Sequence, residues 1–122
     1  MILKMVKEKI YNRLASYSEI TALKKIAVSL SGITGVEKVV FFGSRLRGDF
    51  KGLSDMDIMI IISDISLKDK IISILHDIEL EYDVPISPVI FTGKEYEMNK
   101  RLKSSFVENI EREGLVLYDI KR

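Results

Sequence analysis

The 122-residue sequence contains no cysteine, one histidine, two prolines and no long apolar run. Without cysteine the chain can form no disulfide, thiol nucleophile or cysteine-based metal site, and such a composition fits the reducing cytoplasm. No apolar run approaches the ~20 residues that span a bilayer, so we expect no membrane partner. The 19 basic and 18 acidic residues leave a net charge of +1, which predicts no broad surface for nucleic acid.

Hydrophobic residues make up 47% of the chain and charged residues 30%, a composition typical of a folded domain. At this length we expect one domain over residues 1–122, with a substantial core. The fold class predicted by the order of helices and strands is α/β (α+β), a small mixed β-sheet covered by helices.

Hydrophobic periodicity indicates where the helices and strands lie. The first two apolar stretches predict two helices or one bent helix, the second running from an N-cap at Ser18 to a stop at Gly32. Two prolines place the third strand at an edge of the sheet or interrupt it. The helical stretches are 2–15, 18–32, 66–82 and 94–113, and the strands are 36–42, 56–62, 84–91 and 115–119.

Two aspartates stand where the second strand begins. Asp55 and Asp57 are two residues apart, so in an extended strand they leave the same face, about 6.5–7 Å apart. Two such carboxylates repel each other unless a cation lies between them, and an oxygen-only pair favours Mg2+ or Mn2+. The simpler alternative is that one aspartate caps a turn and the other meets solvent.

The loop before these aspartates contains groups that bind anions. Gly43 lets a backbone N–H approach a phosphate closely, and the Ser44 hydroxyl adds another donor. Arg45 and Arg47 can each fork onto phosphate oxygens. Taken singly, these residues are also compatible with a plain turn and a solvated loop. Together with the two carboxylates they indicate phosphoryl or nucleotidyl transfer.

The segment that carries these groups reads GSRLRGDFKGLSDMDIMI, between two apolar strands. It resembles the signature of the minimal nucleotidyltransferases of the DNA polymerase β superfamily: Gly-Ser, a short spacer, Arg-Gly, a variable loop, then Ser-Asp-x-Asp. The matching positions are Gly43, Ser44, Arg47, Gly48, Ser54, Asp55 and Asp57.

This resemblance implies a nucleotidyltransferase fold and a role for each residue of the motif. Asp55 and Asp57 are the expected catalytic and metal-binding residues, with Mg2+ (or Mn2+) as the cofactor. An NTP, first of all ATP, is the expected substrate, and its NMP passes to a hydroxyl group. The expected nucleotide-binding residues are Gly43, Ser44, Arg45, Arg47 and Ser54.

The resemblance also implies a partner. Stand-alone proteins of this kind are often antitoxins of a helical HEPN-type protein, so a homo- or hetero-oligomer is compatible with the sequence. The family commonly supplies a third carboxylate from the next strand, but the aligned residue here is Ser87, unless Glu81 or Asp83 reaches the site. Two hypotheses follow: an enzyme that adenylylates its partner, or a catalytically degenerate module that neutralises a helical partner by docking.

Overall fold

The structure is a computed structural model that describes residues 17–43, 46 and 55–121. The helix predicted over 2–15 lies outside these residues. No helix in the described part is long and apolar enough to cross a membrane. The elements in chain order are α2 (Tyr17–Ser31), β1 (Val36–Phe42), β2 (Met56–Ile62), the 3-10 helix η1 (Ile65–Leu67), α4 (Lys68–Tyr82), β3 (Ile86–Thr92), α5 (Gly93–Arg101), α6 (Ser105–Glu113) and β4 (Leu115–Asp119).

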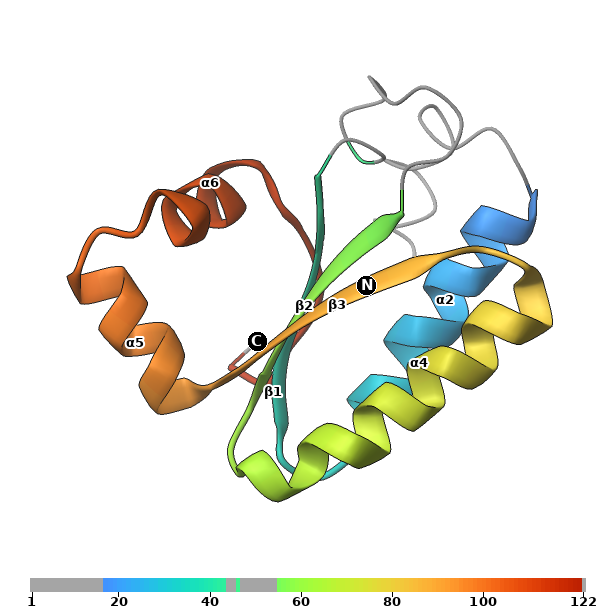
Figure 1. Cartoon of the computed structure of the whole chain (residues 1–122), viewed down its shortest axis with the longest axis horizontal. Coiled ribbons are helices and arrows are strands. Elements are labelled where there is room, and N and C mark those ends of the chain that lie inside the picture. The colour runs from blue at the N-terminus through green and yellow to red at the C-terminus, as the bar shows by residue number, and fades with distance from the viewer. Residues whose placement is uncertain (1–16, 44–45, 47–54, 122) are drawn as a thin grey trace.

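The four strands form one mixed sheet in the order β3-β2-β1-β4. β1 is antiparallel to both β2 and β4, whereas β2 and β3 are parallel. A parallel pair needs a crossover connection, and α4 supplies it. Figure 1 shows α2 and α4 together on one face of the sheet and α5 and α6 on the other. The predicted fold class, a small mixed sheet covered by helices, is confirmed.

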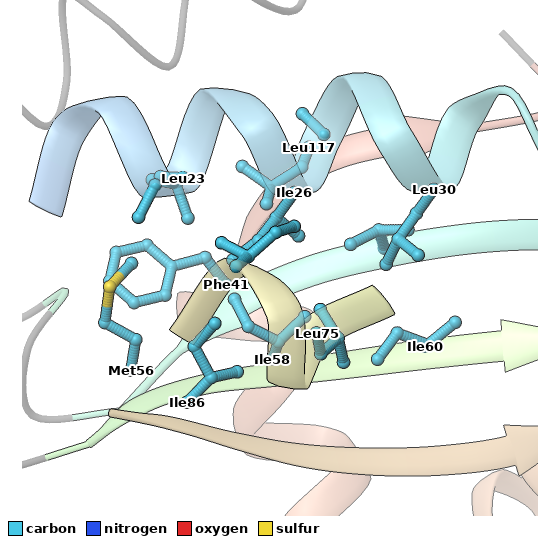
Figure 2. Packing of buried hydrophobic residues seen from close by; sticks show 14 of the residues in the cluster. Leu23, Ile26, Leu30, Phe41, Met56, Ile58, Ile60, Leu75, Ile86 and Leu117 are labelled. Atoms are coloured by element: carbon cyan, nitrogen blue, oxygen red, sulfur yellow. The ribbon is translucent and has the colours of Figure 1, made fainter. Parts of the chain in front are cut away.

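β2 is apolar at nearly every position because both of its faces are covered. Ile58 and Ile60 point into the larger core, toward α2 and α4, and Met59 and Ile61 point into a smaller one toward α5 and α6. In Figure 2, Leu23 and other side chains of α2 lie over the labelled strand residues of the larger core. Since side chains alternate along a strand, Asp57 falls on the same face as Met59.

The structure departs from the predicted boundaries at several places, among them the C-terminal helices, the start of α2 and the start of β3. The helix predicted over 94–113 is two helices, because Lys103 adopts a left-handed φ of 56° and the Ser104 side chain caps α6 by accepting from the Val107 N–H. Ser18 lies inside α2 rather than capping it. The third strand begins at Ile86, two residues later than predicted, and it is an edge strand as its prolines indicated.

A hydrogen bond joins the two C-terminal helices. The buried Tyr96 of α5 donates from its hydroxyl to Glu111 Oε2 of α6, at 2.7 Å, and Lys100 Nζ lies 3.4 Å from the same oxygen. Accepting this bond lowers the pKa of Glu111 below its ordinary value of 4.5, against the effect of desolvation and with help from Lys100. Burial, and then the same bond, raises the pKa of Tyr96. The bond therefore fixes α6 relative to α5.

Core truncation on α4 gives a matched pair of variants. Leu75 is 2% exposed and Leu80 is 69% exposed on the same helix. Leu75→Ala lowers the free energy of unfolding by about 2–5 kcal/mol, because it removes buried methyl groups and leaves a cavity. Leu80→Ala changes it by less than about 0.5 kcal/mol. Urea unfolding followed by circular dichroism measures both, and equal effects would contradict the packing described.

The Tyr96–Glu111 bond predicts a pH-dependent stability. A carboxylate whose pKa is lowered on folding stabilises the fold above its unfolded pKa, and this stabilisation disappears as the pH falls through the folded pKa. Tyr96→Phe therefore destabilises the protein at pH 7, and its difference from wild type shrinks as the pH falls below 4.5. Urea unfolding at several pH values tests this, with Tyr118→Phe on β4 as control. A difference that stays constant with pH would argue against the bond.

Candidate active site

The ends of β1 and β2 bring the glycine and the aspartates of the motif together. In their antiparallel register Phe42, the last residue of β1, is opposite Asp57. The chain leaves β1 at Gly43 and enters β2 immediately after Asp55, so both halves of the motif meet at one end of the sheet. The other predicted nucleotide-binding residues, Ser44, Arg45, Arg47 and Ser54, lie outside the described residues.

Gly43 is tightly constrained by its backbone and by its neighbour. Its φ is +91°, a value that favours glycine. A Cβ at this position would collide with Oδ2 of Asp57. The glycine therefore allows the backbone to lie directly against the Asp57 carboxylate, a close approach that no other residue type permits.

The two aspartates differ in their surroundings. Asp57 is half-buried within β2, whereas Asp55 is exposed and stands just before the strand. Between them, Met56 is fully buried on the opposite face and its N–H donates to the Pro85 oxygen at 2.9 Å. That bond fixes the start of β2 against the residue before β3. The aspartates thus stand at a well-anchored strand end, one partly shielded and the other open to solvent.

Ser87 occupies the position expected from the sequence. In the parallel register of β2 and β3 it lies directly beside Asp57, and it is half-buried. Glu79 of α4 is engaged elsewhere, since its Oε2 accepts a 2.7 Å bond from the Ile86 N–H. Glu81 and Asp83 are exposed at the end of α4, which covers the other face of the sheet. Neither therefore stands in for the third carboxylate.

The donor chemistry of this strand end fits a hard divalent cation. Within the part of the chain that the structure describes, no group of three or more histidine or acidic residues is placed to hold a metal. Asp55 and Asp57 are thus a two-carboxylate set. Mg2+ commonly takes one or two protein carboxylates and fills its other positions with water and substrate phosphates. A pair of this kind suits a metal that arrives together with a nucleotide.

A cavity of about 210 Å³ adjoins the same strand end. It lies between the end of β1 and α6, and its wall is partly aromatic and partly polar. No motif in the sequence marks the α6 residues of this wall as part of a site, although their spacing of three, four and seven places them on one helical face. The lining residues are Phe42, Gly43, Leu46, Phe106, Asn109, Ile110 and Glu113.

Comparison with known proteins supports the motif. A family model described as "Polymerase beta, Nucleotidyltransferase" matches residues 24–122. The chain belongs to this nucleotidyltransferase family. Its activity class is therefore transfer of a nucleotidyl group, and enzymes of the family generally use divalent metal ions.

Two Methanocaldococcus jannaschii proteins are similar to this nucleotidyltransferase, and both are named "Putative protein adenylyltransferase". One is 35% identical over 83 residues, which cover 66% of this chain and 77% of the relative. The other is 36% identical over 83 residues, covering 68% and 79%. The crystal structure of a "putative nucleotidyltransferase" from Sulfolobus solfataricus aligns with a TM-score of 0.46 and 18% identity, over 88% of this chain and 93% of that one.

The contact between Gly43 and Asp57 predicts a steric cost. Gly43→Ala lowers the free energy of unfolding by about 1–3 kcal/mol, because it forces a Cβ into an unfavourable φ and against Oδ2. Gly32→Ala is the matched control, since a Cβ there meets no atom nearer than 3.7 Å. Chemical unfolding of both variants measures the difference. If Gly43→Ala were no less stable than Gly32→Ala, the close approach would be refuted.

Proposed function

We propose that this nucleotidyltransferase transfers AMP from Mg-ATP to a hydroxyl group on a partner protein. The observation that carries the proposal is the meeting of Gly43 with Asp57 at the strand end where Asp55 also stands. A glycine turn that can cradle phosphates and a carboxylate pair that can hold a divalent cation serve the same ligand, a metal-bound triphosphate.

Each residue of the motif has a distinct task. Asp55 and Asp57 would hold Mg2+ through their carboxylate oxygens, and Mn2+ would suit the same oxygens. Gly43 and Ser44 bind the β- and γ-phosphates through backbone and hydroxyl donors. Arg45 and Arg47 neutralise the phosphate charge and stabilise the leaving pyrophosphate, while Ser54 contributes a further hydroxyl. These roles are those that the resemblance of the motif to the minimal nucleotidyltransferases implies.

The reaction is a displacement at the α-phosphorus of ATP. A bound divalent cation neutralises phosphate charge and polarises the phosphoryl oxygens. The acceptor oxygen forms a bond to the α-phosphorus, and the bond to the β-phosphate bridging oxygen breaks, releasing pyrophosphate. The chain holds the triphosphate in line for this attack, and positioning provides most of the acceleration.

Ser87 determines what happens to the acceptor proton. A serine hydroxyl is no base at neutral pH, and Ser87 lies beside Asp57 where the family commonly has a carboxylate. The proton therefore passes to water rather than to β3. We expect transfer to be slower than in relatives with a third acid, which suits a regulatory modification that needs few turnovers.

We place the acceptor on a helical HEPN-type protein, with this chain as the antitoxin of the pair. The two relatives named as protein adenylyltransferases support a protein as the acceptor. In this role the chain inactivates its partner by adding AMP to a hydroxyl.

One observation favours a second candidate function, a module that neutralises the same partner by docking alone. Ser87 leaves the described site with two acids, and this number is enough to bind a metal-nucleotide without efficient transfer. Docking and transfer make different demands here, because docking on the partner needs neither aspartate, whereas transfer needs both of them ionised to hold the metal.

A labelling experiment tests the proposed transfer. The protein is incubated with Mg2+, ATP labelled at the α-phosphate, and the protein encoded by the neighbouring gene. We expect label on that protein, and a loss of about 10²–10³-fold in Asp55→Asn and Asp57→Asn, because each removes charge that holds the metal. Asp77→Asn, at an exposed position on α4, is the control and keeps full activity. EDTA abolishes the labelling.

The docking hypothesis predicts the opposite pattern. A tight complex that forms with both aspartate variants, without any label in the wild type, would exclude transfer and support docking. Ser87→Asp adds a direct test of the missing acid. A gain of labelling in this variant shows that the proton acceptor limits the wild-type rate.

A further inference from the structure

We propose that the cavity between β1 and α6 binds the base of the nucleotide and selects adenine. This inference rests on the proposed function, since it assumes that the triphosphate lies at the motif. Gly43 belongs to both places: it lines the cavity and touches the Asp57 carboxylate. A nucleotide whose phosphates lie at Gly43 therefore has this cavity beside it.

The walls of the cavity suit a flat aromatic ligand. Phe106 remains 38% exposed although it is a large apolar side chain, and its ring packs edge-on against Phe42 with centroids 5.5 Å apart. The buried Leu46 and Ile110 complete the apolar part of the lining. Nucleobases stack on aromatic side chains with a gain of about 1–3 kcal/mol for each base. A base in this cavity would cover the exposed ring of Phe106.

Two polar side chains give the cavity its selectivity. Asn109 and Glu113 are four residues apart on α6 and both line the cavity. Arg112 Nη2 donates to Asn109 Oδ1 at 2.7 Å, which engages the amide oxygen and leaves the Nδ2–H2 group as the donor of this side chain. Glu113 presents carboxylate oxygens, which accept; one of them lies 3.5 Å from Arg112 Nη2. The wall therefore offers one donor beside one acceptor.

This donor–acceptor pair matches one edge of adenine. Adenine presents the N7 acceptor beside the N6 amino donor, which pair with the Asn109 amide and the Glu113 carboxylate respectively. Guanine presents two acceptors, N7 and O6, along the same edge. Its O6 would face the Glu113 carboxylate, and two acceptors repel each other. The cavity thus favours ATP over GTP.

The surrounding packing keeps this wall in place without any ligand. Phe91 of β3 contacts Phe106 with ring centroids 6.3 Å apart, and the Tyr96–Glu111 bond fixes α6 to α5. Because the cavity is preformed, the protein loses little conformational entropy when a nucleotide binds. The preference for adenine therefore appears as a difference between the affinities for ATP and GTP.

Calorimetry on the full chain with Mg2+ tests the proposal, using ATP, GTP and inorganic tripolyphosphate as separate ligands. We expect ATP to bind about tenfold more tightly than GTP. Phe106→Ala lowers the affinity for ATP about tenfold and leaves the affinity for tripolyphosphate unchanged, because only ATP carries a base. Glu113→Gln lowers the ATP-to-GTP preference, since its amide can donate to O6. Glu108→Gln, an exposed position on the same helix outside the cavity, preserves it.

Tripolyphosphate separates this inference from the proposed function. If Asp57→Asn leaves the Mg2+-dependent binding of tripolyphosphate intact, the proposed function is refuted, regardless of the relative affinities for ATP and GTP. If ATP and GTP bind equally, or Phe106→Ala weakens tripolyphosphate as much as ATP, the base cavity is refuted while the phosphate site stands. If Phe106→Ala weakens only the association with the partner protein, the cavity holds a partner side chain and the proposal is overturned.

Discussion

The antiparallel pairing of β1 with β2 is the constraint on which the site depends. Its register places Phe42 opposite Asp57, and thereby sets Gly43 against the carboxylate. A slip of one residue would turn Asp57 to the face of α2 and α4, where it would be buried without water. The same slip would turn Ile58 and Ile60 out of the larger core and onto the opposite face of the sheet. Core packing thus holds the aspartate at the site.

The two faces of the sheet have different roles. The larger core beneath α2 and α4 provides the bulk of the buried apolar surface, and that face takes no part in the proposed chemistry. On the other face, α5 and α6 pack on the sheet through a smaller cluster around Met59 and Tyr96. This lighter covering leaves room for a cavity beside Gly43. The face under α2 and α4 therefore provides most of the stability, and the face under α5 and α6 provides access for a ligand.

Much of the fold could be predicted from the sequence, because local patterns specify it. The strands 36–42 and 56–62 carry β-branched runs and 115–119 is a short apolar run, and all three were predicted with the correct bounds. The break at Lys103 was missed, since neither glycine nor proline marks it. At the site, the motif located Gly43 and Asp57, but the role of α6 was beyond prediction. Asn109 and Phe106 reach the cavity only through the tertiary packing of α6 on the sheet.

The contact between Gly43 and Asp57 also bears on how such sequences can change over time. A larger residue at position 43 collides with the carboxylate, and a residue without a carboxylate at position 57 removes the proposed metal ligand. No single substitution at either position keeps both the geometry and the chemistry. Homologues that retain a metal-nucleotide site are therefore expected to keep this pair together, and those that lose one member are freed from selection on the other.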